Sequence, residues 1–154
     1  MKQSRLVLVL WVALVLLAAC QPPGDAGSHA LSPSTPITSG APAGPLLADG
    51  QQCGDMQVWL SSTPAQPLAG SAQLDTFLTD GAGKPLSGAQ VTYDIDMTNM
   101  SHGTYLVPAE PAAAGHYSGR VHFSMAGPWR VIATIVRPGE PDVRLRFEFR
   151  VNAG

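Results

Sequence analysis

The chain has 154 residues, a length that suits one domain with extensions. Its 9 lysines and arginines and its 11 aspartates and glutamates give a formal charge of −2 at pH 7. Nucleic-acid binding, which needs a basic face, is therefore not expected. The arginines near the C-terminus are interpreted as part of a solvated strand face.

Residues 1–19 resemble a lipoprotein signal peptide. Lys2 and Arg5 precede an unbroken apolar run, which is short for a membrane span of ~20 residues but suits a secretory signal. The run ends in LLAAC, which resembles the lipobox of bacterial lipoproteins. This resemblance implies that the signal is cleaved before Cys20 and that this cysteine is lipidated. The alternative is an ordinary signal peptide followed by a chance cysteine.

A lipidated Cys20 would hold the mature protein on a membrane surface of the cell envelope, outside the cytoplasm. Attachment by two or more acyl chains is stable, because each buried methylene contributes ~0.8 kcal/mol. Gln21 stands where, by the same resemblance, an aspartate would favour the inner membrane. The expected location is therefore the outer membrane in a host that has one. Loss of Lys2 and Arg5 with the signal leaves 7 basic residues and a formal charge of −4.

Residues 20–53 are expected to form a flexible tether. They are rich in Pro, Gly, Ser, Ala and Thr, so burial of apolar surface cannot offset the entropy lost on ordering. If Cys20 carries lipid, Cys53 has no partner in the same chain. Cys53 is expected to be a free or buried thiol, and the alternatives are pairing between molecules and ligand binding.

Residues 54–154 show the pattern of short β-strands. Apolar and polar residues alternate, and Gly or Pro ends the runs, over residues 56–62, 72–80, 91–97, 116–125, 127–136 and 143–151. No stretch has a helical period. About seven strands in roughly one hundred residues predict an all-β fold, an immunoglobulin-like antiparallel β-sandwich. Trp129, Phe147 and Phe149 are expected in its core.

The sequence carries none of the familiar catalytic signatures. The stretch GAGKP resembles a phosphate-binding loop, but Leu78 stands where its first glycine would be and Pro85 replaces the Ser or Thr that would hold magnesium. Asp94 and Asp96 share one side of a predicted strand and are interpreted as a solvated edge. No enzyme activity is expected.

The stretch MTNMSH points to a soft metal ion. It places Met97 and Met100 three positions apart, with His102 two positions further on. Thioethers bind hard ions poorly but bind Cu(I) selectively, and imidazole binds both Cu(I) and Cu(II). Met97 is expected on the polar-facing side of its strand, with the aspartates, and Met125 is the fourth candidate ligand.

Packing is the alternative explanation of these methionines. Met97 and Met100 could cap the open end of the sandwich. Met125 is in phase with the apolar residues before it, which favours packing. His122 points the opposite way and is expected in solvent, and His116, at a strand entry, is a weak candidate.

The segments GKPLSGAQVTYDIDMTNMSHG and GHYSGRVHFSMAGPWRVIATI resemble the YtkA-like and FixH-like domains of bacterial exported proteins. The resemblance covers residues 70–136. It rests on a Gly-Lys-Pro-x-x-x-Ala-x-Val strand, a Met-x-x-Met-x-His segment, a Gly-x-Tyr strand and a Phe-x-Met-x-Gly-x-Trp corner. The residues that match are Gly83, Lys84, Pro85, Ala89, Val91, Met97, Met100, His102, Tyr117, Phe123, Met125, Gly127 and Trp129.

This resemblance implies an immunoglobulin-like sandwich, and some such domains occur with copper-handling or cytochrome-oxidase assembly systems. A lipidated Cys20 would replace the transmembrane helix that is typical of FixH-type proteins. We therefore predict a lipid-anchored extracytoplasmic domain that carries or buffers copper, as Cu(I), and exchanges it with a donor or acceptor protein. The predicted metal ligands are Met97, Met100, His102 and Met125. The alternative is an interaction or assembly module of the cell envelope that binds no metal.

The variant Cys20→Ser tests the anchor. Without the thiol no lipid can be attached, so the protein should be released from the membrane or remain unprocessed. Membrane fractionation and the mass of the mature chain measure both outcomes. Unchanged membrane attachment with normal cleavage would show that Cys20 is not the anchor.

Overall fold

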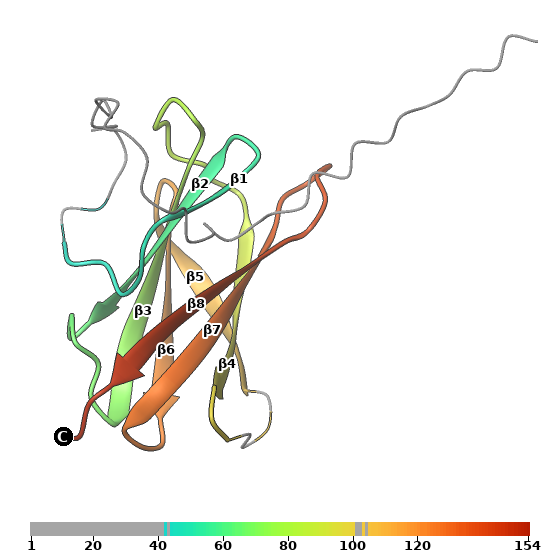
Figure 1. The fold of residues 1–154 in the computed structure, drawn as a ribbon. Coiled ribbons are helices and arrows are strands. Elements are labelled where there is room, and N and C mark those ends of the chain that lie inside the picture. Colours follow the sequence, from blue (N-terminus) through green and yellow to red (C-terminus); the bar gives the residue numbers. More distant parts are fainter. Residues whose placement is uncertain (1–41, 43, 101–102, 104) are drawn as a thin grey trace, which may run out of the picture.

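The computed structural model describes residue 42, residues 44–100, residue 103 and residues 105–154. The predicted signal peptide and the predicted lipidation site at Cys20 lie outside these residues. The described part of the chain forms eight strands: β1 (Gln51–Cys53), β2 (Met56–Thr63), β3 (Gly70–Thr79), β4 (Gln90–Met97), β5 (Tyr105–Ala113), β6 (His116–Phe123), β7 (Gly127–Val136) and β8 (Val143–Val151) (Figure 1). No helix in this part of the chain could cross a membrane. The predicted all-β fold is confirmed.

The strands form one antiparallel sheet in the order β1-β2-β3-β6-β5-β4-β7-β8. Strand β5 belongs to both layers of the fold, because its first half pairs with β4 and its second half pairs with β6. The sheet therefore folds over at β5 and places β1, β2, β3 and β6 against β4, β7 and β8 (Figure 1). At the far side, Asn152 after β8 exchanges backbone hydrogen bonds of 2.9 Å with Pro67 and Ala69 before β3. The sandwich is thus close to a closed barrel.

The core follows the two-residue period of the strands. In β4 and β7 every second residue is buried and the residues between are half-buried, as expected for strands with one face against the opposite layer. Trp129 and Phe147 are buried, and Phe149 packs against the core from its edge. Phe123 contacts both Trp129 and Phe149 edge to face, with ring centroids 5.1 and 5.7 Å apart. The three predicted core anchors are confirmed.

A buried hydrogen bond joins the two layers. The hydroxyls of Tyr93 on β4 and Thr76 on β3 lie 2.9 Å apart, and both residues are fully buried. Burial raises the pKa of the Tyr93 phenol well above its ordinary value, because the charged form would lose its hydration. Tyr93 therefore stays neutral, and its hydroxyl fixes the position of one layer against the other.

Two strands of the structure were not recognised from the sequence. Strand β5 contains Pro108 and Pro111, which cannot donate to a ladder and weaken a strand pattern. Strand β1 lies within residues 20–53, which were expected to form the tether. The backbone N–H of Leu47 also donates to Leu60 on β2 at 2.8 Å. Ordered structure therefore begins several residues before the predicted domain boundary at residue 54.

Cys53 ends β1 and packs against the edge of the core. No cysteine among the described residues is a free thiol. The expectation that Cys53 is a free thiol is therefore wrong.

The variant Tyr93→Phe tests the bond between the layers. It removes a buried hydroxyl and leaves that of Thr76 without its partner, so it should lower the free energy of unfolding by about 1–3 kcal/mol. Urea denaturation measures the loss. Tyr105→Phe is the matched control, because half of Tyr105 is exposed and its loss should stay within about 0.5 kcal/mol. Equal losses in the two variants would show that the hydroxyl pair does not hold the layers together.

Candidate functional site

The end of β4 and the turn before β7 lie at the same end of the sandwich (Figure 1). Strands β4 and β7 are antiparallel neighbours, so the last residue of β4, Met97, lies opposite Trp129 near the start of β7. The pairing extends one step further, since the N–H of Thr98 donates to the Pro128 carbonyl at 3.1 Å. Residues 98–100 and residues 124–126 therefore lie at the same end.

Met100 and Met125 are the exposed thioethers of this end. Met100 follows β4 and is 45% exposed, and Met125 follows β6 and is 38% exposed. Packing was the favoured explanation for Met125, because it is in phase with the apolar residues before it. Strand β6 ends at Phe123, however, so the alternation of buried and exposed positions does not continue to Met125, and its side chain is exposed. The Trp129 indole donates to the Met125 carbonyl at 3.0 Å, which fixes the backbone of this turn.

Met97 lies in the core. It is 3% exposed, and a Cβ added to Gly127 would lie 2.7 Å from its terminal methyl group. The expectation that Met97 faces the polar side with Asp94 and Asp96 is wrong. Met97 follows Ile95 by two residues and so shares the buried face of β4, a signal that was present in the sequence. The structure thus supports the packing explanation for this methionine.

His102 lies outside the described residues. Its neighbour Gly103 is described and has a φ of +90°, a left-handed conformation that glycine adopts without strain.

A cavity of about 340 Å³ opens beside the two turns. It lies where β5 and β6 separate: β6 pairs with β5 only from Glu110 onward, whereas Tyr105–Ala109 pair with β4. The lining residues are Ile95, Asp96, Gly103, Tyr105, His122, Ser124 and Trp129. His122 was expected to face open solvent, but its side chain lines this cavity. The cavity could not be predicted from the sequence, because the separation of β5 from β6 depends on pairing between distant segments.

The polar side chains of the cavity lining are Asp96, Tyr105, His122, Ser124 and Trp129. Among the described residues, no group of three or more His, Cys, Asp and Glu side chains could hold a metal ion. The Asp96 carboxylate is already engaged, since it accepts from Arg130 at 3.1 Å and from the Met97 N–H at 2.8 Å. His116 is engaged elsewhere: its Nε2 lies 2.8 Å from Asp75, and its ring stacks on Phe77.

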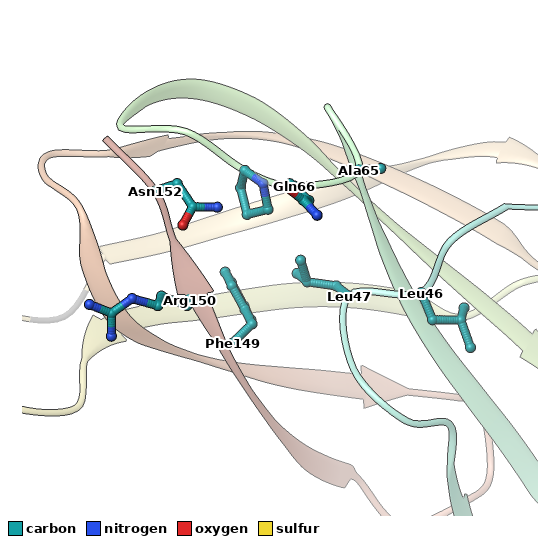
Figure 2. Close-up of a pocket in the computed structure, with 8 residues that line it drawn as sticks. Leu46, Leu47, Ala65, Gln66, Phe149, Arg150 and Asn152 are labelled. Atoms are coloured by element: carbon teal, nitrogen blue, oxygen red, sulfur yellow. The ribbon is translucent and has the colours of Figure 1, made fainter. Parts of the chain in front are cut away.

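A second hollow, of about 440 Å³, lies at the end of β8 (Figure 2). It is lined by Leu46, Leu47, Ala65, Gln66, Pro67, Phe149, Arg150 and Asn152. Its polar groups are amides and one guanidinium, and its lining holds no thioether or imidazole. It therefore lacks the donors that a soft metal ion needs.

Residues 50–134 match the family model described as YtkA-like, and a comparison with curated proteins finds no match. Among solved structures, the chain is similar to a copper-bound variant of FetP from uropathogenic Escherichia coli, with a TM-score of 0.54 and 12% identity over 69% of this chain and 95% of that one. It is also similar to FetP as isolated after expression in the periplasm, with a TM-score of 0.50 and 11% identity over 70% and 95% of the two chains. A DUF4426 family protein from Pseudomonas aeruginosa gives a TM-score of 0.51 and 15% identity over 69% and 98%. At such low sequence identity, the structural similarity shows a shared fold and nothing more.

The variant Gly127→Ala tests the packing of Met97. The new methyl group would meet the Met97 side chain at 2.7 Å and would also have to adopt a φ of +145°. Gly70→Ala is the matched control, because Gly70 has a φ of +122° and no atom near the added methyl group. Overpacking should make Gly127→Ala less stable than the control by about 1 kcal/mol or more. Equal losses in urea denaturation would mean that Met97 moves aside freely and is not held by the core.

Proposed function

The chain belongs to the YtkA-like family, and from this membership and its exposed thioethers we propose that it is a copper-binding domain of the cell envelope. The observation that carries the proposal is the exposure of Met100 and Met125 on two turns that the β4–β7 pairing brings to one end. An apolar side chain in an exposed turn contributes little to stability, whereas a thioether there is available to a soft ion.

The proposed ligands are Met100, His102 and Met125, and the proposed ion is Cu(I). Thioether and imidazole groups bind Cu(I) well, and methionine, unlike cysteine, is not consumed by disulfide formation in an oxidising compartment. Met97 is not among the proposed ligands, because its side chain belongs to the core. The fold is compatible with this role, since a variant of FetP, which shares the fold, has a copper-bound structure.

The role that suits this site is that of a carrier or buffer. The two turns lie at the surface, where a copper donor or acceptor protein could reach the ion without unfolding of the domain. Lipidation at Cys20 would keep the domain at the membrane, on the outer membrane if the host has one, and residues 20–45 would let it reach away from the surface.

A second candidate function is protein interaction without metal. Tyr105 and Leu106 at the start of β5 are 50% and 60% exposed, and Met100 is 45% exposed, so this end of the molecule carries several exposed large apolar side chains. Such surfaces commonly mark contact sites. Copper binding distinguishes the two functions, because an interaction module would not retain the ion.

The double variant Met100→Leu, Met125→Leu tests the proposed function. Leucine keeps the volume and apolarity of methionine, so the stability cost should be below about 1.5 kcal/mol, but it has no sulfur. Cu(I) affinity should fall by more than about tenfold, that is by about 1.4 kcal/mol or more. The measurement is competition with a Cu(I) chelator under reducing, oxygen-free conditions, using the full chain purified in detergent.

Two further changes make this measurement specific. All variants carry Cys53→Ser, because Cys53 is not a free thiol in the structure but could become a thiolate under the reducing conditions of the assay, and a thiolate would bind Cu(I) by itself. Met97→Leu is the matched control, since it removes a thioether from the core only, and its affinity should equal that of the parent. A double variant that binds like the parent, or a parent that binds no Cu(I), would exclude the proposed site.

A further inference from the structure

We infer that Met100 and Met125 are sites of reversible oxidation, at which a peroxide converts each thioether to a sulfoxide. The described part of the chain holds four methionines, and they fall into two groups. Met100 and Met125 are 45% and 38% exposed, whereas Met56 and Met97 are 0% and 3% exposed. An oxidant dissolved in water reaches the first pair in the folded protein, but it reaches the second pair only when the core opens.

The exposure of both sulfurs belongs to the folded state. The Trp129 indole donates to the Met125 carbonyl at 3.0 Å, which holds the backbone of that turn. Met100 lies two residues after Thr98, whose N–H donates to the Pro128 carbonyl at 3.1 Å and so extends the pairing of β4 with β7. Both thioethers are therefore carried by segments that are tied to one ladder, and no local unfolding is needed to expose them.

The reaction needs only the sulfur and the oxidant. A sulfur lone pair attacks one oxygen of hydrogen peroxide, so that an S–O bond forms, the O–O bond breaks and sulfur gives up two electrons. The second oxygen leaves as hydroxide and takes up the proton of the transferred oxygen, which yields a sulfoxide and one water. A methionine sulfoxide reductase reverses the change with two thiols, which become a disulfide while the oxygen leaves as water.

Oxidation at these two positions changes the surface without disturbing the core. A sulfoxide presents a polar oxygen in place of an apolar, polarisable sulfur, and at Met100 and Met125 that oxygen is solvated. At Met97 the same oxygen would be buried, beside the position where Gly127 leaves room for the terminal methyl group, and burial of an unpaired polar group is costly. The exposed pair can thus be oxidised and reduced while the domain stays folded.

The experiment treats the full chain in detergent with hydrogen peroxide, both folded and in concentrated urea, and follows each methionine by site-resolved mass spectrometry. The rate in urea serves as each residue's own reference, because the core is then open. Folding should slow oxidation at Met56 and Met97 by about tenfold or more, and at Met100 and Met125 by less than about threefold. The urea midpoint should be the same before and after oxidation of the exposed pair, and methionine sulfoxide reductase with dithiothreitol should restore both thioethers.

A second measurement tests the consequence for copper, which rests on the proposed function. A sulfoxide lacks the soft sulfur donor that Cu(I) prefers, so oxidation should lower Cu(I) affinity by about tenfold or more, and the reductase should restore it. Chelator competition measures the affinity after the peroxide has been removed, with Cys53→Ser in all proteins. The affinity of Met97→Leu should respond to peroxide like that of the parent, whereas Met100→Leu, Met125→Leu should not respond.

The outcomes separate this inference from the proposed function. If folding protects Met100 and Met125 as strongly as Met97, or if their oxidation shifts the urea midpoint, the inference is overturned and the copper function stands. Sulfoxides that the reductase leaves in place on the folded protein would also overturn it, because the change would not be reversible. If the two sites oxidise as expected but the parent binds no Cu(I), the proposed function fails and the oxidation sites stand.

Discussion

The antiparallel pairing of β4 with β7 is the constraint on which the proposed functional end of this molecule depends. An antiparallel ladder sets the end of one strand beside the start of the other, so two turns that are more than twenty positions apart in the sequence are brought together. The ladder runs from Gln90 opposite Val136 to Met97 opposite Trp129. The hydrogen bond from Trp129 to the Met125 carbonyl then fixes the second turn relative to the first. Neither turn could hold a site by itself, because each offers only one or two soft donors.

The change of pairing partner along β5 also shapes this end of the molecule. By pairing first with β4 and then with β6, β5 joins the two layers of the sandwich. The same change of partner leaves the start of β5 and the end of β6 apart, and the cavity lies in this gap. The fold thus produces a sheltered space next to exposed thioethers without an insertion or a separate loop. The bond between Tyr93 and Thr76 holds the two layers at a fixed separation further along the sandwich.

The three methionines of this end illustrate how one residue type serves two purposes. Met97 fills space against Gly127, where only a residue without a side chain leaves room for its methyl group. Met100 and Met125 lie just beyond strand ends, where no opposite layer covers them. A flexible, polarisable side chain suits both settings. The surroundings of each sulfur, rather than the spacing of the methionines, therefore decide which of them an ion can reach.

The sequence by itself determined the fold class, since a two-residue period such as that of β8 leaves one face of a strand apolar wherever the strand is placed. It also determined the soft character of the candidate site, because no folding turns a thioether into a ligand for a hard ion. Only the tertiary structure decided that Met125 is exposed and that His122 lines a cavity, and only there did β5 become visible as a strand despite its prolines. The period of a strand is local and can be counted along the chain. The place where a strand ends, changes partner or separates from its neighbour depends on contacts between distant segments, and those contacts set which side chains meet.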